Sequence, residues 1–424
     1  MMVPFEARFE KIMDLSRTLP ALKDRFISLA ARDLKFTAKD TAHEVDLTVD
    51  RLQLFAQARG LLENRRPLGG PGSSVALMLS YNGSAWLNTV IASCYLVGNK
   101  VLVKFSSKGA EVRALLESVY RPIFGNDIVF YHGGGRSFMA ESLANPEIAA
   151  VVVFGFDSHT ITYQEAFKNC GKKLVFEGPG VDPFIVFADA DLDLALNDLM
   201  TAKFAYSGQT CTAPKRIFIH QAIYDEFLAK LVERVRRLTV GEPEDVRTDI
   251  SPVASDVAVE RIKLYLEDAL LKGARVLAGG KIDGNLVYPT VVRDATDEML
   301  GMREEVFGPV AFTTAFTTAA EVLARARNHK YGLRAAVFGG PKAQRVAQDL
   351  KGEDYCHPVS DYTFGKFGTV SVNEPRSESW KGALVVKPAG GYGYSGWIWE
   401  TVDGRFRIKQ GPKLISLETS TPDE

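Results

Sequence analysis

A chain of 424 residues, 46% hydrophobic and 24% charged, is too long for one compact core and predicts two or three domains. Its formal net charge of −1 gives no electrostatic footprint for nucleic acid or a membrane surface, so we expect neither as a partner. No apolar run reaches the roughly 18 residues that span a bilayer, and the acidic N-terminal stretch lacks the apolar region of a signal peptide.

The four cysteines are scattered along the chain without a Cys-x-x-Cys pair. This argues against a disulfide scaffold and against a cysteine-rich zinc site, and a reducing cytoplasm is the simplest compartment. The histidines show no ligand-like spacing, so we expect no metal site.

The N-terminal region has apolar positions at helical spacing, which predicts helices over 9–34 and 49–64. The Gly- and Pro-rich stretch 65–74 breaks this pattern as a loop. Strand and helix patterns then alternate. Predicted strands cover 75–81, 100–105, 127–132 and 149–156, and predicted helices cover 85–98 and 108–125. Continuous apolar strands between helices indicate a parallel sheet covered on both faces.

A second alternating region starts near residue 180. Predicted strands cover 183–189, 215–220, 274–280, 309–316 and 333–340, and predicted helices cover 192–207, 224–238, 258–273 and 319–329. A last strand-like stretch, 405–418, lies outside the alternation. We therefore predict an α/β protein with two tandem Rossmann-like open parallel-sheet domains. Their expected bounds are 1–178, with the N-terminal helices, and 179–385, followed by a C-terminal segment over 386–424.

Two glycine-rich motifs are candidates for binding phosphate. The Gly-x-Gly-x-x-Gly match at Gly391, Gly393 and Gly396 is weak, because only 28 residues follow it, too few for a βαβ unit. The motif HGGGRS, residues 132–137, follows a predicted strand and precedes a helical stretch, so its backbone N–H groups are placed to cradle a phosphate. A plain flexible turn explains it equally well.

Cys211 stands in FAYSGQTCTAPKR, residues 204–216, between a predicted helix and a predicted strand. A free cysteine is usually buried and inert, whereas a reactive one needs a polar site that favours the thiolate. The polar, turn-like Ser-Gly-Gln-Thr run before Cys211 leaves both interpretations open. Glu177 follows an apolar strand and precedes Gly-Pro-Gly; burial there raises the pKa of a carboxyl group toward that of a general base.

Together these segments resemble the aldehyde dehydrogenase superfamily, from about residue 75 to the C-terminus. The segment around Glu177 is similar to the family's Glu-Leu-Gly-Gly segment, and the one around Cys211 to its nucleophile segment, and their separation of 34 residues matches the family spacing. Further matching stretches are 80–86, 98–107, 304–310, 328–340 and 368–373.

The resemblance implies a hydrolytic aldehyde dehydrogenase that uses NAD or NADP and a small-molecule aldehyde. It implies a dinucleotide-binding domain over 1–178 and a cysteine-bearing catalytic domain over 179–385. Cys211 is then the nucleophile, Asn82 and the Cys211 N–H hold the oxyanion, and Glu177 activates water. The expected cofactor contacts come from five residues: Tyr81, Lys104, Ser107, Glu305 and Phe307.

Several positions depart from the family pattern. Ser107 replaces a glutamate that binds ribose hydroxyls and repels a 2′-phosphate, so NADP becomes acceptable. Phe156 and Asp157 replace the Gly and Ser that open a helix beside the pyrophosphate, which disfavours the usual cofactor pose. Tyr81 and Tyr206 stand where Trp and Asn are usual.

Two alternatives stay open: a relative that passes the acyl group to coenzyme A, and a catalytically silent binding protein. The resemblance also implies that the C-terminal strand serves oligomerisation. The family's N-terminal hairpin is reduced to a short loop, so a homodimer is expected rather than a tetramer. Lys366 and Arg376 are weak candidates for a substrate carboxylate. Residues near Tyr81, Trp86 and Tyr206 and the loops around 355–380 are expected to line the substrate pocket.

Overall fold

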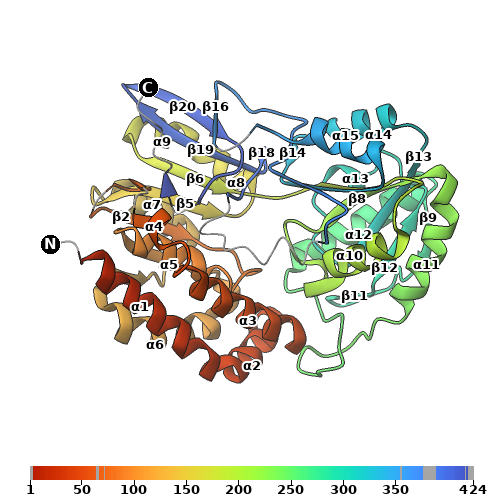
Figure 1. The fold of residues 1–424 in the computed structure, drawn as a ribbon. Coiled ribbons are helices and arrows are strands. Elements are labelled where there is room, and N and C mark those ends of the chain that lie inside the picture. Colours follow the sequence, from red (N-terminus) through yellow and green to blue (C-terminus); the bar gives the residue numbers. More distant parts are fainter. Residues whose placement is uncertain are drawn as a thin grey trace.

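The computed structural model describes residues 3–63, 66–70, 72–353, 356–375, 388–415 and 417–418. Its helices and strands form two sheet-centred halves that lie side by side (Figure 1). The expected α/β fold class with two parallel-rich sheets is confirmed.

The first sheet has eight strands in the order β16-β20-β19-β6-β5-β2-β3-β4. Its parallel part consists of β2 (Ser74–Met78), β3 (Lys100–Lys104), β4 (Ile128–Phe130), β5 (Ile148–Phe154) and β6 (Lys173–Glu177). The order β4-β3-β2-β5-β6 is that of a Rossmann half. Its connections diverge from the neighbouring strands β2 and β5, which creates a crevice at their carboxyl ends.

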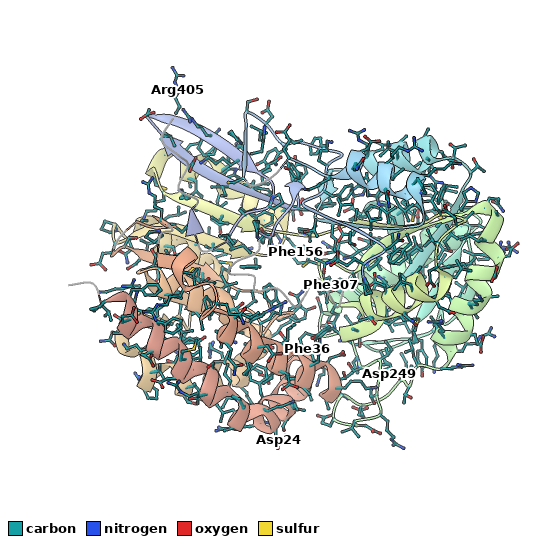
Figure 2. The ribbon with its side chains drawn as sticks, in the orientation of Figure 1. Asp24, Phe36, Phe156, Asp249, Phe307 and Arg405 are labelled. Atoms are coloured by element: carbon teal, nitrogen blue, oxygen red, sulfur yellow. The ribbon has the colours of Figure 1, made fainter. Side chains whose placement is uncertain are left out.

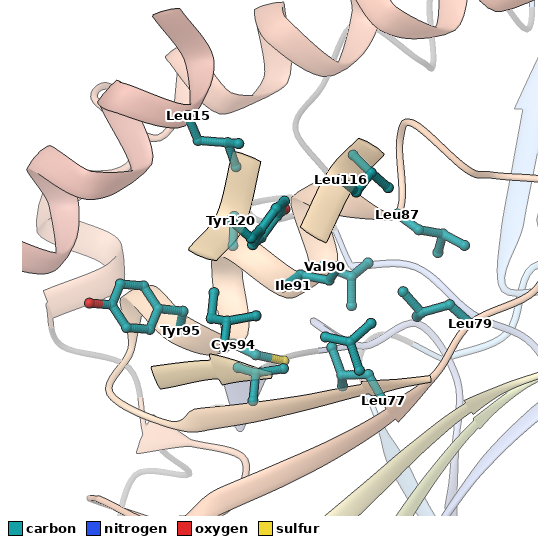
Figure 3. Packing of buried hydrophobic residues seen from close by; sticks show 14 of the residues in the cluster. Leu15, Leu77, Leu79, Leu87, Val90, Ile91, Cys94, Tyr95, Leu116 and Tyr120 are labelled. Carbon is teal, nitrogen blue, oxygen red and sulfur yellow. The ribbon is translucent and has the colours of Figure 1, made fainter. Parts of the chain in front are cut away.

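Helices cover both faces of this sheet. One face carries α5 (Asn88–Leu96) and α6 (Ala110–Phe124), and over them lie the N-terminal helices α1 (Phe5–Thr18), α2 (Lys23–Leu34), α3 (Ala38–Leu54) and α4 (Arg59–Glu63). Figure 3 shows this core, in which Val90 and Ile91 of α5 pack against Leu77 of β2 and Tyr120 of α6. The other face carries α7 (Gly135–Ala144), α8 (Asp157–Thr160) and α9 (Gln164–Cys170).

The C-terminal segment returns to the first sheet. Strand β19 (Gly396–Val402) pairs antiparallel with β6, and β20 (Arg405–Gln410) pairs with β19 and with β16 (His357–Val359). Buried Trp397 and Trp399 of β19 pack against Phe176 and Phe167 of the first half. The strand expected over 405–418 is therefore interrupted. Its first part extends the chain's own sheet, and β21 (Leu417–Glu418) pairs with β1 (Arg66–Pro67).

The second sheet has the order β17-β15-β7-β8-β13-β12-β9, with all pairs parallel except β12 with β9. Its strands are β7 (Asp182–Val186), β8 (Pro214–His220), β9 (Arg275–Ala278), β12 (Thr290–Arg293), β13 (Val310–Phe316), β15 (Arg334–Phe338) and β17 (Thr369–Val372). The helices around it are α10 (Leu192–Phe204), α11 (Tyr224–Arg236), α12 (Asp256–Leu271), α13 (Leu300–Arg303), α14 (Ala319–Arg327) and α15 (Pro341–Leu350). Two short pairs complete the fold: β10 (Ile282–Asp283) with β11 (Leu286–Val287), and β14 (Tyr331–Gly332) with β18 (Tyr392–Gly393).

No helix among the described residues is long and apolar enough to cross a membrane. In Figure 2, Phe156 and Phe307 mark the junction between the two halves. This junction brings the carboxyl end of β6 to the amino ends of β7 and β8, because the chain crosses from one sheet to the other through residues 178–181.

Candidate functional site

Cys211 follows a backbone turn with an uncommon conformation. After α10, Tyr206 and Ser207 have φ of 54° and 52°, and Gly208 has φ of +72°. A left-handed conformation costs a side-chain-bearing residue about 1–3 kcal/mol and persists only where the surroundings fix it. Glycine is required at 208, since a Cβ there would lie 2.2 Å from the carbonyl oxygen of Gly308. The nucleophile segment thus packs directly on the segment around 304–310.

The segment after Glu177 packs on Cys211 from the other side. A Cβ on Gly180 would lie 2.4 Å from the carbonyl oxygen of Cys211, so only glycine allows this approach. The Gly180 N–H donates to Oε1 of Glu305 at 3.3 Å. The structure therefore brings together three segments that the sequence singled out, around residues 177, 211 and 305.

The surroundings of Cys211 favour the protonated thiol over the thiolate. Its pKa is raised to about 12, chiefly by burial and in smaller part by the carboxylates of Glu305, Asp182 and Glu177. Lys215 opposes this shift. Its fully buried Nζ donates to the carbonyl oxygens of Thr210 and Cys211 at 2.9 and 2.7 Å, and lies 3.9 Å from Oε1 of Glu305. A nucleophilic Cys211 consequently has to lose its proton first.

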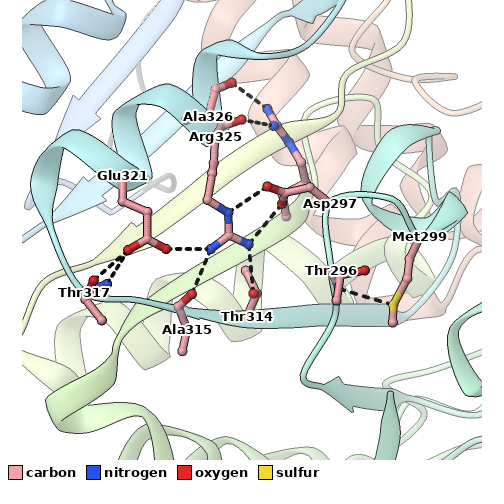
Figure 4. A network of polar contacts seen from close by, with 10 residues as sticks. Thr296, Asp297, Met299, Thr314, Ala315, Thr317, Glu321, Arg325 and Ala326 are labelled. Atoms are coloured by element: carbon pink, nitrogen blue, oxygen red, sulfur yellow. Dashed lines mark hydrogen bonds and ion pairs between the residues drawn. The ribbon is translucent and has the colours of Figure 1, made fainter. Parts of the chain in front are cut away.

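Lys215 was not among the predicted site residues. The signal was the basic pair Lys215–Arg216 directly after the nucleophile segment. Because β8 alternates its side chains, Arg216 projects away from Lys215 and donates to the carbonyl oxygens of Val181, Arg325 and Ala326. Figure 4 shows the adjoining network, in which Arg325 forms a bidentate ion pair with Asp297. These contacts anchor β8, the strand that directly follows the nucleophile turn.

Glu177 ends β6 and is buried, with 8% of its surface exposed. Burial raises its pKa, and the ammonium group of Lys413, whose Nζ lies 3.1 Å from Oε1, opposes that rise. Lys413 is itself only 2% exposed. Gly390 makes room for the pair, since a Cβ there would lie 2.5 Å from Oε1 of Glu177. The C-terminal segment thus supplies a counter-charge to the candidate base, which the sequence did not reveal.

Asn82 lies in the loop that follows β2, at the carboxyl edge of the first sheet. Its side-chain amide forms no hydrogen bond with any residue in the described part of the chain. The preceding Tyr81 donates its hydroxyl to Oε1 of Gln209 at 3.2 Å, and its ring meets Phe307 edge to face at 6.2 Å. Tyr81 thus ties the Asn82 loop to the nucleophile turn and to Phe307.

The residues that could hold a dinucleotide lie along the crevice at the carboxyl ends of β2, β3 and β5. Ser107 is exposed just after β3. Lys104 is buried and its ammonium group donates to the carbonyl oxygen of Phe105. Glu305 and Phe307 lie on the opposite side, next to Cys211 and Tyr81. The strand order places a topological switch point between β2 and β5, and polar and aromatic groups of the kind that bind a nicotinamide dinucleotide surround it.

The turn after β5 carries two residues, Phe156 and Asp157, that do not favour a bound dinucleotide. Asp157 opens the short helix α8 and accepts a hydrogen bond from the Tyr331 hydroxyl at 3.1 Å. Phe156 is 41% exposed, and the guanidinium carbon of Arg261 on α12 lies 5.4 Å from the centre of its ring. Both residues therefore connect the two halves across the crevice, and Asp157 places a negative charge where a diphosphate would approach.

The other sequence candidates lie elsewhere. The motif at 132–137 follows the edge strand β4 and is mostly exposed, and the motif at 391–396 leads into a strand instead of a helix. The ammonium group of Lys366 donates to the carbonyl oxygens of Asp349 and Lys351, and Arg376 lies outside the described residues. Tyr206 is buried among N-terminal helices, so its side chain packs in the core.

The site combines a thiol, a buried carboxylate with its own cation, and an amide available as a donor. This combination supports covalent catalysis by the thiol followed by base-assisted hydrolysis. A sequence model described as the aldehyde dehydrogenase family matches residues 2–404 of the chain.

Two curated relatives are 30% identical to this chain. The 2-aminomuconic semialdehyde dehydrogenase of Bos taurus aligns over 358 residues, which are 80% of this chain and 71% of the relative. The 2-aminomuconic 6-semialdehyde dehydrogenase of a Pseudomonas species aligns over 337 residues, 75% of this chain and 66% of the relative. Among solved structures, an oxidoreductase from Marinobacter aquaeolei superposes with a TM-score of 0.85 at 26% identity, covering 99% of this chain and 85% of that one.

Proposed function

The chain belongs to the aldehyde dehydrogenase family, and from this premise we propose that Cys211, Glu177 and Asn82 carry the family's reaction in this protein. That reaction is the NAD(P)-dependent oxidation of an aldehyde to a carboxylic acid. The convergence of the segments around Cys211 and Glu177, tied together through Gly180, is the observation that carries the proposal.

The nucleophilic step begins with loss of the Cys211 proton. The proton passes to solvent water, so Glu177, whose negative charge raises the pKa of the thiol, stays free to act as the base of the later hydrolysis step. The Sγ–carbon bond then forms at the aldehyde carbon, and the oxygen that becomes negative is held by the Asn82 amide and the Cys211 N–H. Lys215 holds the carbonyl oxygens of Thr210 and Cys211 and thereby orients this turn.

A dinucleotide held by Lys104, Ser107, Glu305 and Phe307 would supply the hydride acceptor, and loss of that hydride would turn the carbon bound to Cys211 into a thioester. Glu177 takes a proton from water as the water oxygen attacks the thioester carbon. The carbon–sulfur bond breaks, the acid departs and the thiol is restored. Lys413 keeps the carboxylate of Glu177 ionised and oriented for this step.

The cofactor contacts are assigned by position. Lys104 and Ser107 serve the adenosine ribose at the end of β3, while Glu305, Phe307 and Tyr81 border the nicotinamide end beside Cys211. With Ser107 in place of a carboxylate, both NAD and NADP are accepted. Under this proposal 1–178 forms the dinucleotide-binding domain and 179–385 the catalytic domain, while 386–424 supplies Lys413 to Glu177.

The substrate is a small aldehyde. The two relatives are named for semialdehydes of 2-aminomuconate, so a semialdehyde with a remote carboxylate is the first class to test. The four free thiols are consistent with a reducing compartment, and we place the protein in the cytoplasm. We further propose a homodimer.

Hydrolysis of para-nitrophenyl acetate tests the catalytic assignment without a cofactor, since ester cleavage needs only the nucleophile, the oxyanion donors and the base. Cys211→Ala should abolish both the burst of para-nitrophenolate and the steady state. Glu177→Gln should keep the burst and stop the steady state, because the acetyl-enzyme forms but is not hydrolysed. Full steady-state turnover in either variant would refute the assignment. A parallel measurement of NAD(P)H formation with semialdehydes and aromatic aldehydes identifies the substrate class, and acceleration by coenzyme A would favour the acylating alternative.

A further inference from the structure

Helix α3 turns a polar face toward the interior of the molecule. A set of polar side chains recurs on it at helical spacing and points inward: Asp40, Thr41, Glu44, Thr48 and Arg51. Glu44 is 2% exposed and Arg51 is 6% exposed. Buried charge on a helix is costly unless it is used, and the mechanism above does not use it.

Glu44 contacts the loop that carries Asn82. Its Oε1 accepts hydrogen bonds from the backbone N–H groups of Ala85 at 3.0 Å and Trp86 at 3.2 Å. These two groups belong to the turn between Asn82 and α5. When ionised, a carboxylate there forms charge-assisted hydrogen bonds with both N–H groups. Glu44 thus fixes the backbone three residues after Asn82.

Asp40 contacts the turn that carries Cys211. Its Oδ2 accepts a hydrogen bond from the backbone N–H of Tyr206 at 2.9 Å and another from the Thr37 hydroxyl at 2.7 Å. Tyr206 is the first of the consecutive left-handed residues before the nucleophile. Ser207 is held in turn by Ser251, whose N–H donates to its hydroxyl at 2.9 Å. Asp40 therefore helps to hold this strained turn in place.

The two carboxylates are one helical turn apart, so a single rigid helix holds both loops. The groups that face them are Arg51 and the Tyr206 hydroxyl near Glu44, and Lys39 and Asp249 near Asp40. Burial raises the pKa of Glu44 to about 7 and that of Asp40 to about 6, despite their hydrogen bonds to N–H groups. A stable fold does not need two such costly groups at this position, and their contacts lead to the catalytic loops.

We propose that Asp40 and Glu44 are positioning residues, through which α3 sets the oxyanion loop of Asn82 and the nucleophile turn of Cys211 relative to each other. This inference rests on the proposed roles of Asn82 and Cys211. Neither carboxylate touches the reacting atoms; each acts through the backbone that it holds.

A double-mutant cycle on para-nitrophenyl acetate hydrolysis tests the part played by Glu44. Glu44→Gln keeps the shape and one acceptor oxygen but removes the charge, and it should lower kcat/KM about tenfold, because neutral hydrogen bonds hold the loop less firmly. Asn82→Ala should lower it by about 10²- to 10³-fold. If Glu44 acts through Asn82, the double variant should have the same kcat/KM as Asn82→Ala alone. Once the Asn82 amide has been removed, a shift of the loop that carried it has no further effect. Asp50→Asn, an exposed acid on the same helix, is the matched control.

The outcomes separate the inference from the proposal beneath it. Multiplicative effects in the double variant, with Asn82→Ala impaired, would overturn the role of Glu44 and leave Asn82 as the oxyanion donor. Full activity in Asn82→Ala would overturn the oxyanion assignment and the inference with it. A merely structural role predicts that Glu44→Gln lowers Tm together with activity. The positioning role predicts lower activity at an unchanged or higher Tm in mildly alkaline buffer, because an ionised buried carboxylate has been removed.

Asp40→Asn tests the other contact. Loosening the left-handed turn should expose the thiol, so iodoacetamide should label the Cys211 peptide faster while ester turnover falls. Glu44→Gln, which leaves this turn in place, should not change the labelling rate. Unchanged turnover and labelling in Asp40→Asn would overturn the role of Asp40.

Discussion

The ion pair between Lys413 and Glu177 allows a sharp test of the site. Replacing Lys413 by Met keeps a similar side-chain length but removes the cation that opposes the raised pKa of Glu177. With Nζ and Oε1 3.1 Å apart, an effective dielectric constant near 20 gives an attraction of about 5 kcal/mol. Removing one partner of a buried pair typically costs about 3–5 kcal/mol, because the remaining charge is left in a poorly solvating site.

Loss of the Lys413 ammonium group should slow the hydrolysis of the acyl-enzyme. Without Lys413 the pKa of Glu177 rises further, so a smaller fraction of the carboxyl group is ionised and able to accept a proton from water. In Lys413→Met, stopped-flow hydrolysis of para-nitrophenyl acetate should retain the burst, while the steady-state rate should fall at neutral pH and recover as pH rises. The folded variant should also lose stability as pH rises, since the carboxylate of Glu177 must then ionise without its partner.

Lys409→Met is the control. Lys409 lies on β20, is partly exposed, and forms an ion pair with Glu400 instead of Glu177. Glu400 also contacts Lys173, so it keeps a cationic partner in the variant. It should leave the pH profile of the steady state unchanged. If the profile of Lys413→Met superposes on that of the wild type, Lys413 does not control the ionisation of Glu177 and the reasoning fails.

Three further predictions follow from charges in and around the site. Burial raises the pKa of Glu44 from 4.5 to about 7, so the folded state binds more protons than the unfolded state in this interval, and stability should fall by about 3 kcal/mol as pH rises through it. Glu44→Gln should remove this part of the pH dependence, which is measured as the difference between the urea midpoints at pH 4.5 and pH 7. The same difference in wild type and variant would contradict the prediction. Because the pKa of the Cys211 thiol is about 12, its alkylation by iodoacetamide without cofactor should keep accelerating with pH well above neutrality; a plateau near neutral pH would show a thiolate that the structure does not predict. Asp157→Ser should strengthen the binding of NAD(P) in calorimetry by removing a negative charge near the diphosphate, and equal or weaker binding would refute that placement.

The sequence predicted the alternating elements of both sheets, because continuous apolar strands and amphipathic helices have distinct periodicities. It missed the start of α3, which begins at Ala38 behind the Thr37 cap and was expected only from residue 49. The reason is physical: the inner face of α3 is polar around Glu44 and Arg51, so an apolar periodicity was absent where the helix is most buried. Polar residues at helical spacing were the signal that would have revealed it.

Lys413, the partner of the candidate base Glu177, could not be predicted from the sequence for a different reason. Lys413 reaches Glu177 only because β19 pairs with β6 and turns the C-terminal segment back onto the first sheet. Local patterns near Lys413 contain no trace of this pairing, since it depends on long-range register. The segments around Glu177 and Cys211, in contrast, are recognisable locally, because their glycines are required where the backbones meet.

The site also lies at an unusual edge for an open sheet. Ligands usually bind at the carboxyl ends of parallel strands, and Asn82 and Glu177 obey this rule in the first sheet. Cys211, however, precedes β8 and so lies at the amino end of its own sheet, which the fold turns toward the carboxyl edge of the other. The nucleophile therefore depends on contacts that cross between the halves, such as those of Tyr81 with Gln209 and Asp40 with Tyr206. Catalytic geometry in this protein is a property of the junction, and substitutions that loosen the junction should lower activity before they unfold either half.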